Sequence, residues 1–369
     1  MIDPQSPHPR FYQLYLQLRE RIIAGEFAPL QPIPSQQQLM EAYRVSLITV
    51  RRALERLTAE GYITREHGRG CFVTPSSNWL SNRRRMVQIG IIVSSIPNSF
   101  FPEIIAGVES FFAGREVQLV IAHSRWDPEL EQSQISHFLD QGCAGLLISP
   151  SQPVEAYRAL KATGTPFVFF NHYYPDPIFN FVVTDDRTGA HQAADHLLAL
   201  GHRRIGAIIG GRGKRTAMDR EEGLRAACEE KAAPLDDTWI VRPETFTYEE
   251  GRDGMAALLA RHPDLTAVFC SSEILAVGAA EHLFSAGRRI PEDVSLVAFG
   301  NSDTSRFFQI PLTTIHQPTH EMGAKAAEML WAMLSGETPV PGQLRLACRL
   351  VVRASSGPAR ELTPPKGGE

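Results

Sequence analysis

The sequence predicts an α/β protein in two unequal parts: a small N-terminal module of helices closed by a β-hairpin, and a larger domain of two α/β lobes. Residues 10–74 contain short amphipathic helices followed by two β-rich runs, whereas the later chain alternates apolar strands with amphipathic helices. Between these patterns, residues 75–82 read Pro-Ser-Ser-Asn-Trp-Leu-Ser-Asn, which is typical of a linker. We therefore expect a head at 1–75, a linker at 76–86 and a body at 87–369.

The head is predicted to contain three helices. The first runs from near Phe11 to near Gly25, because apolar residues recur between them at helical spacing. Ser35 can cap the second helix, with Gln38 returning a hydrogen bond to the cap backbone. Ser46 can cap the third helix. This third helix has an apolar face of Val50, Ala53, Leu54 and Leu57, and a polar, basic remainder that includes Thr49, Arg51, Arg52 and Arg56.

Helices related in this way form a helix-turn-helix, whose second helix can enter the major groove of DNA. The predicted hairpin at 62–74 carries two glycines and a basic tip, which suits contact with phosphates or with a narrow minor groove. Residues 10–74 resemble the winged helix-turn-helix of GntR-type bacterial transcription regulators. The resemblance implies that DNA is contacted by Ser35, Ser46, Thr49, Arg51, Arg52, His67, Gly68 and Arg69.

The head departs from that family's pattern at two positions. Gln36 stands where the family usually has Glu, and Leu47 stands where it has an Arg directly after the capping Ser46. The lost Arg changes or weakens base readout. An operator sequence taken from the family is therefore not transferable to this chain.

The body is predicted to contain parallel strands covered by helices on both faces. The candidate strands are Val87–Val93, Val117–Ala122, Gly145–Ser149, Phe167–Phe170, Phe181–Thr184, Ile205–Ile209, Ala267–Cys270 and Ser295–Phe299. The candidate helices are Phe101–Phe112, Gly189–Leu200, Glu221–Glu230, Glu249–Ala260 and Leu275–Gly287. These strands are too many for one five-stranded unit, so we expect two similar lobes with a cleft between them.

Several segments of the body resemble the effector domain of LacI-type regulators, which has the type I periplasmic-binding-protein-like fold. They include Ile89-Gly90-Ile91-Ile92-Val93, Arg220-Glu221-Glu222-Gly223-Leu224 and Pro311-Leu312-Thr313-Thr314-Ile315, in that order. The resemblance extends from Val87 to Ser356. A GntR-type head joined to a LacI-type body is the arrangement of AraR-like repressors, a sugar-responsive group that this chain resembles.

By that resemblance, a small-molecule effector binds in the cleft, at strand ends and lobe crossings. The implied contacts are Ser94, Asn98, Phe100, Phe101, Asn171, Arg220, Phe246, Ser272, Glu273 and Asn301. Aromatic rings can cover the apolar faces of a sugar, while Arg, Glu and Asn side chains bond its hydroxyls. However, Gly300-Asn301 stands where the family commonly has a carboxylate pair, and Asn301 or Asp303 could substitute. A sugar, a modified sugar, a sugar acid and a nonsugar metabolite all remain open.

Four features of the body have two interpretations each. His172 comes directly after a predicted strand and is either a hydrogen-bonded structural histidine or a ligand contact. Asp185-Asp186 either caps the next helix or binds ligand. His196 and His202 either pack or place charge at a helix end, which is the favoured interpretation, or bind a metal. The glycine-rich stretch at 210–214 lacks phosphate-loop spacing, which favours a flexible lip of the cleft.

Composition and charge agree with a regulator of this kind. The 369 residues are 43% hydrophobic and 21% charged, with a net charge of −4. Residues 1–75 hold 9 Arg, no Lys and 7 acidic residues, a balance of +2, so the remainder carries −6. This asymmetry fits a small nucleic-acid-binding head on a body that does not bind DNA.

Other functions are disfavoured by missing patterns. The sequence has no apolar run of membrane-spanning length, and its first residues lack a secretory pattern. Its five cysteines are scattered, which predicts a reducing compartment and no structural metal or cofactor. Hydrolase-elbow, zinc-protease and dinucleotide-binding motifs are absent from the sequence, so an enzyme is not expected. We expect a cytoplasmic, homodimeric repressor that binds double-stranded operator DNA, does not act at a membrane and is released by an effector. A solute-binding protein without a regulatory role is the alternative.

Overall fold

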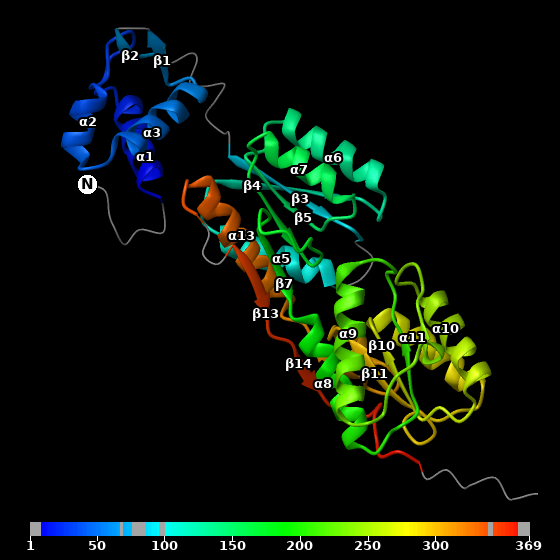
Figure 1. The fold of residues 1–369 in the computed structure, drawn as a ribbon. Coiled ribbons are helices and arrows are strands. Elements are labelled where there is room, and N and C mark those ends of the chain that lie inside the picture. Colours follow the sequence, from blue (N-terminus) through cyan, green and yellow to red (C-terminus); the bar gives the residue numbers. More distant parts are fainter. Residues whose placement is uncertain (1–8, 67–68, 76–85, 96–99, 339–341, 361–369) are drawn as a thin grey trace, which may run out of the picture. The chain divides into compact units, whose positions relative to one another are not determined.

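The computed structural model describes residues 9–66, 69–75, 86–95, 100–338 and 342–360 (Figure 1). Two compact units are present, one built mainly from residues before Ile89 and the other mainly from residues after it. The predicted linker at 76–86 lies outside the described residues except for Met86, so its boundaries stay a prediction. The predicted fold class is confirmed: a winged helix-turn-helix head and an α/β body.

The head has three helices and a two-stranded hairpin: α1 (Arg10–Ile23), α2 (Gln36–Tyr43), α3 (Leu47–Ala59), β1 (Ile63–Glu66) and β2 (Gly70–Val73). Ser35 caps α2 through the predicted capping box. Ser46 caps α3 by accepting a hydrogen bond from the Thr49 amide. Between these helices, Arg44 has a φ of 51°, a left-handed conformation that ends α2 and redirects the chain into α3.

The apolar faces of the three helices meet in one core with the wing. Leu18 of α1, Leu54 of α3 and Val73 of β2 are all buried in it. The hairpin strands pair antiparallel, in a register that places Ile63 opposite Val73. Because the buried stripe of α3 faces this core, its other face is available to solvent.

The first lobe of the body is a six-stranded sheet in the order β13-β7-β6-β5-β3-β4 within the described residues. Its strands are β3 (Val87–Val93), β4 (Val117–His123), β5 (Gly145–Ile148), β6 (Phe167–Phe170), β7 (Phe181–Thr184) and β13 (Gln343–Leu346). Its helices are α5 (Phe100–Phe112), α6 (Pro128–Asp140), α7 (Val154–Ala162) and α13 (Thr319–Leu334). Helices α5 and α13 pack together (Figure 1), and Tyr157 of α7 donates a hydrogen bond to Glu131 of α6.

The second lobe has a sheet in the order β14-β12-β11-β10-β8-β9. Its strands are β8 (Ile205–Ile208), β9 (Ile240–Val241), β10 (Ala267–Cys270), β11 (Ser295–Phe299), β12 (Thr313–His316) and β14 (Arg349–Val351). Its helices are α8 (Asp186–Ala199), α9 (Arg215–Glu230), α10 (Tyr248–Arg261), α11 (Glu273–Ser285), α12 (Asp303–Phe307) and a 3-10 turn, η1 (Asp237–Trp239). Helices α8 and α9 pack as one pair and α10 and α11 as another.

The chain passes between the two lobes at three places in the described residues: from β7 to α8, from β12 to α13, and from β13 to β14. Hydrogen bonds join these crossing segments to one another. The Asp185 amide donates to the Leu346 carbonyl at 2.8 Å. Gln317 Nε2 donates to Thr184 Oγ1 at 3.0 Å. A relative movement of the lobes therefore has to act on a small bonded region.

All eight predicted body strands are present, with ends within one residue of the prediction. Three helix starts were predicted wrongly, of which α11, at Glu273 instead of Leu275, is displaced least. Helix α8 begins at Asp186 instead of Gly189, and α9 begins at Arg215 instead of Glu221. Arg220 therefore lies inside α9 and not before it. The first turns of α9 bury polar side chains such as Thr216 and Asp219, which hid the helix from a hydrophobic pattern.

Helices α5 and α13 approach so closely that glycine is required on both. A Cβ added at Gly107 would lie 2.0 Å from the His320 carbonyl oxygen, and one at Gly323 would lie 1.9 Å from that of Ile104. Since neither contact is with a flexible side chain, the helices would have to separate to admit a methyl group.

We expect Gly323→Ala to lower the free energy of unfolding by roughly 1–3 kcal/mol through overpacking, despite alanine's higher helix propensity. Urea denaturation of the full chain measures this. Gly254→Ala in α10 is the matched control, because its nearest atoms belong to the Ile208 side chain at 3.2 Å and can shift. Equal stabilities for the two variants would contradict the close approach.

Candidate functional site

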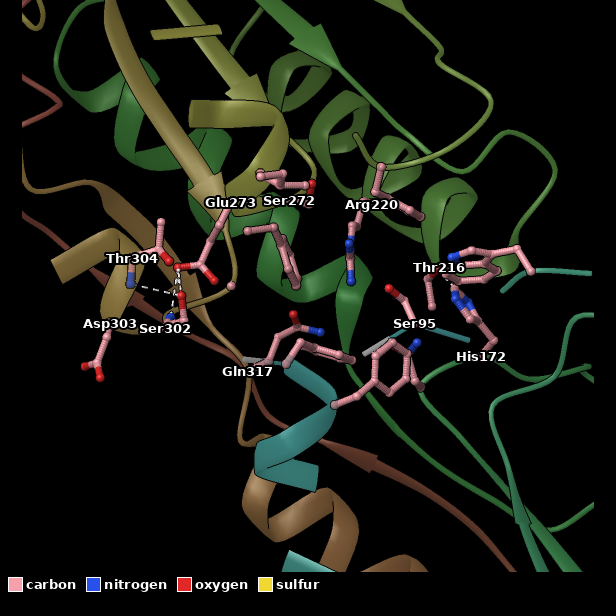
Figure 2. A pocket seen from close by; sticks show the side chains of 18 residues that line it. Ser95, His172, Thr216, Arg220, Ser272, Glu273, Ser302, Asp303, Thr304 and Gln317 are labelled. Carbon is pink, nitrogen blue, oxygen red and sulfur yellow. Dashed lines mark hydrogen bonds between the residues drawn. The ribbon is translucent and has the colours of Figure 1, made fainter. Parts of the chain in front are cut away.

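A cavity of about 360 Å³ opens between the two lobes of the body (Figure 2). Its aromatic lining residues are Phe100, Phe101, Trp126, Phe246 and Phe299. Its polar and charged lining residues are Ser95, Asn171, His172, Thr216, Arg220, Ser272, Glu273, Ser302, Asp303, Thr304 and Gln317. Aromatic surface combined with converging polar groups is the usual composition of a small-molecule site.

Most of these residues follow the carboxyl ends of parallel strands. Ser95 follows β3, Asn171 and His172 follow β6, and Glu273 follows β10. Gln317 comes directly after β12, at a crossing between the lobes. Parallel strands present their loops at one edge, which explains why segments distant in sequence converge here.

Arg220 is the cation of the cavity. It is only 6% exposed, and its guanidinium points into the cavity from α9 (Figure 2). Nη1 donates to the Ser271 carbonyl at 2.6 Å, and the guanidinium lies 4.0 Å from the centre of the Phe299 ring. Among the described residues, Nε has no hydrogen-bond partner, so a donor is left for a ligand.

Asp186 compensates the charge of Arg220. Its Oδ2 lies 3.1 Å from Arg220 Nη2, and both side chains are buried. Burial raises the pKa of the Asp186 carboxyl, while Arg220 and a hydrogen bond from Thr184 oppose that rise. Thr184 Oγ1, which donates to Asp186 at 2.5 Å, also accepts from Gln317. The cation of the cavity thus contacts the first crossing segment directly and is linked to Gln317 of the second through Asp186 and Thr184.

Glu273 supplies a carboxylate at one end of the cavity. The Ser302 amide donates to its Oε1 at 2.8 Å, and Ser305 Oγ also bonds this oxygen. Burial raises the pKa of Glu273, against these hydrogen bonds. A Cβ at Gly300 would lie 2.8 Å from Glu273 Oε2, so the carboxylate occupies the space that a side chain at position 300 would fill.

His172 is held as a neutral hydrogen-bonding group at the other end. Its Nδ1 lies 3.0 Å from Thr216 Oγ1, and the side chain is 5% exposed. Burial lowers its pKa to about 3, and the cations Lys214 and Arg220 add to the effect. His172 therefore makes a structural hydrogen bond and also lines the cavity, so both of its interpretations are compatible with the structure.

An aromatic contact between two lining residues joins the lobes in the wall of the cavity. Trp126, from the connection between β4 and α6, lies 6.2 Å from Phe246 of the second lobe, measured between ring centres. Its ring also packs against His172, and Lys214 Nζ lies 5.2 Å from its centre. Sequence reasoning missed Trp126, because it sits in a connection whose course the pattern of strands did not reveal.

Seven of the ten predicted effector contacts line the cavity: Phe100, Phe101, Asn171, Arg220, Phe246, Ser272 and Glu273. Asn98 lies outside the described residues. Ser94 is fully buried and bonds Ser149 at 2.8 Å, so that Ser95 faces the cavity in its place. Asn301 is not among the lining residues and accepts hydrogen bonds from Arg353 and Thr314. Contact of any of them with an effector stays a prediction.

The remaining ambiguous residues have structural partners. Asp185 caps α8 by accepting a hydrogen bond from the Thr188 amide. His196 Nε2 lies 2.8 Å from Ser356 Oγ, and buried His202 contacts Thr266 and Ser295. In the described parts of the chain, no cluster of His, Cys, Asp or Glu side chains could hold a metal ion. No helix there is long and apolar enough to span a membrane.

In the head, the predicted DNA contacts that are described lie at the N-caps of α2 and α3, within α3 and in the wing. Ser35, Ser46, Arg51 and Arg69 are exposed, while Thr49 and Arg52 are half-buried. Arg69 forms a 2.6 Å ion pair with Glu66 across the wing. His67 and Gly68 lie outside the described residues. The first two residues of α3, Leu47 and Ile48, are also exposed.

Two known families match separate parts of the chain. Residues 12–73 match the bacterial regulatory proteins of the gntR family, and residues 194–356 match the periplasmic binding protein-like domain. The first match lies in the head, and the second contains most of the second lobe, with Arg220 and Glu273, together with α13 and β13 of the first lobe.

Several known proteins are similar to the chain over most of its length. The chain is 30% identical over 319 residues to the transcriptional repressor CytR of Escherichia coli K12, which covers 86% of this chain and 90% of CytR. It is 28% identical to an arabinose metabolism transcriptional repressor of Geobacillus stearothermophilus, over 88% of this chain and 91% of that protein. A solved complex of the transcriptional regulator CelR with cellobiose has a TM-score of 0.67 and 28% identity, covering 85% of this chain and 92% of that one.

We expect Arg220→Met to destabilise the protein by roughly 3–5 kcal/mol near neutral pH, because it leaves Asp186 buried without its cation. Removing Arg220 raises the folded-state pKa of Asp186 further above that of the unfolded chain. The folded variant then binds more protons than the unfolded one, so its stability falls as pH rises and recovers in part on acidification. Thermal unfolding at about pH 5, 6 and 7.5 measures this trend.

Arg187→Met is the matched control, since Arg187 pairs at 3.5 Å with Glu222 and both side chains are more than half exposed. It should cost less than about 1 kcal/mol with no such pH trend. A pH-independent loss in Arg220→Met would contradict the role given to Asp186.

Proposed function

The chain belongs to the family of transcriptional repressors that join a gntR-type head to a periplasmic-binding-protein-like body, and we propose that it releases its operator when a neutral sugar fills the interlobe cavity. It is a DNA-binding transcriptional regulator. The observation that supports the sugar proposal is the chemistry of the cavity: aromatic walls with a charge-compensated arginine between them.

The lining suits a polyhydroxy compound. Five aromatic rings offer apolar surface to the C–H faces of a sugar ring. Arg220, Asn171 and Gln317 supply donors, while Glu273 and Asp303 supply acceptors. A hydroxyl both donates and accepts, so it can use both kinds of group. The CelR structure was solved with cellobiose, and we propose that this chain likewise binds a neutral sugar.

The charges of the lining favour a neutral effector over a sugar acid. Asp186 already compensates Arg220, the one cation among the described lining residues. Glu273 and Asp303 add negative charge at one end of the cavity (Figure 2). A carboxylate or phosphate on the ligand would meet two acids and a cation that is already paired.

Binding is proposed to close the two lobes about their crossing segments. Arg220 connects the cavity to those segments through Asp186, Thr184 and Gln317. A ligand bonded to both lobes would shift the population toward a closed body. We further propose that the protein acts as a cytoplasmic homodimer on a pseudo-palindromic operator and catalyses no reaction. The head disfavours a solute-binding role without gene regulation.

Separate substitutions should abolish the two activities independently. Arg51→Ala removes an exposed cation of α3, so operator affinity should fall about tenfold or more while effector affinity is unchanged. Arg220→Lys keeps a cation beside Asp186 but loses the planar fork, so effector affinity should fall while operator affinity is retained. Fluorescence anisotropy and isothermal titration calorimetry, at one fixed salt concentration, measure the two affinities. Equal loss of both activities in both variants would contradict the two-site arrangement.

A matched panel should distinguish neutral from acidic effectors. Each neutral pentose, hexose or disaccharide is paired with the acid or phosphate of the same ring, and release of labelled operator is measured. The acid should be at least about tenfold weaker than its neutral parent, because it places like charges together. In Glu273→Gln, the difference in operator release between the neutral sugar and its acid should be smaller, because one of the like charges is removed. Stronger release by the acid members would exclude a neutral effector.

A further inference from the structure

Two apolar side chains stand in solvent at the start of α3. Leu47 is 37% exposed and Ile48 is 68% exposed. The other aliphatic residues of this helix, Val50, Leu54 and Leu57, are no more than 1% exposed. The exposure of Leu47 and Ile48 therefore does not arise from a loosely packed helix: the core is complete without them.

Both side chains share a face with Arg51. Leu47 precedes Arg51 by four residues and Ile48 precedes it by three, and side chains at these spacings are neighbours on a helix. Arg51 is exposed. Thr49 lies between Ile48 and Arg51 in sequence, but its hydroxyl is 2.9 Å from Ser46 Oγ and belongs to the N-terminal cap. The outward surface of the first turn is thus apolar, with a cation one turn further along.

In a winged helix-turn-helix, the N-terminal residues of the second helix of the motif meet the base edges of the major groove. An aliphatic side chain there can neither donate nor accept a hydrogen bond. The thymine methyl is the apolar group that base pairs display in this groove. Against guanine or cytosine, Leu47 or Ile48 would cover O6, N7 or N4 and leave it without a partner.

We propose that Leu47 and Ile48 read thymine methyl groups, so that each operator half-site presents thymine to the first turn of α3. Leu47 replaces the Arg that is usual in gntR-type heads, which would read guanine through O6 and N7. This inference rests on the DNA-binding role of the head and adds which base its first turn selects.

The operator is first selected from random duplexes with the full chain. Each thymine of that operator is then replaced in turn by deoxyuridine, which removes only the methyl group. At one or two positions in each half-site, uracil should weaken binding about fourfold, the effect of losing one buried methylene-sized group. Anisotropy at fixed salt concentration measures this.

The variant Leu47→Ala/Ile48→Ala should lose the distinction between thymine and uracil at those positions. Its melting temperature should match that of the parent, because both side chains lie outside the core. Leu47→Arg should select guanine at the same place. Ile23→Ala, which shortens a 40% exposed apolar side chain of α1, is the matched control and should keep the parent's preference.

Uracil operators that bind as tightly as thymine operators at every position would overturn the proposal. So would a methyl effect that persists in Leu47→Ala/Ile48→Ala, because the methyl would then act through DNA shape. In both cases the parent still selects an operator, and the regulatory function stands. A parent chain that selects no sequence at all would overturn both this inference and the DNA half of the function. Loss of dimerisation in the double variant, with DNA affinity unchanged, would assign the apolar pair to a protein contact and overturn the proposal.

Discussion

A cation inside a protein has to be compensated, and in this body Asp186 compensates Arg220. The requirement determines much of the surrounding structure. Arg220 reaches the cavity only because α9 begins at Arg215 and carries it in its second turn. Asp186 reaches it because α8 begins directly after β7, at the first crossing between the lobes. The pair therefore links a helix of the second lobe to the segment on which that lobe turns.

The same pair gives a physical route from ligand to hinge. Asp186 also accepts from Thr184, and Thr184 accepts from Gln317 of the second crossing. Gln317 itself lines the cavity. A ligand that bonds Arg220 or Gln317 competes with these hydrogen bonds or aligns them. Under the proposed function, a ligand that displaces one of these hydrogen bonds changes the partners of the neighbouring groups, because a buried polar group that loses its partner is costly.

The parts that the sequence predicted are those fixed by short-range rules. Ser35 and Ser46 predict helix starts because their hydroxyls can cap a helix N-terminus. Strands such as Phe167–Phe170 are continuous apolar runs. The misses have a different origin. Helix α9 begins with buried polar residues, and Trp126 reaches the cavity only through the packing of a connection. These features depend on contacts between lobes, which no local pattern records.

Two departures from the family pattern have opposite consequences. In the cavity, position 300 has lost its side chain, but the Glu273 carboxylate fills the space beside Gly300 and keeps an acceptor there. In the head, Leu47 is exposed on the surface of α3 that we propose contacts DNA, so its replacement of Arg changes that surface itself. A charge lost from a concave site can be restored by a neighbour reaching into the gap. On the outer surface of a helix the side chains point apart, so a neighbour cannot replace a lost side chain and the partner contacts the residue at that position. Under the two proposals, the cavity departure therefore leaves the ligand class unchanged, while the head departure changes the base that is read.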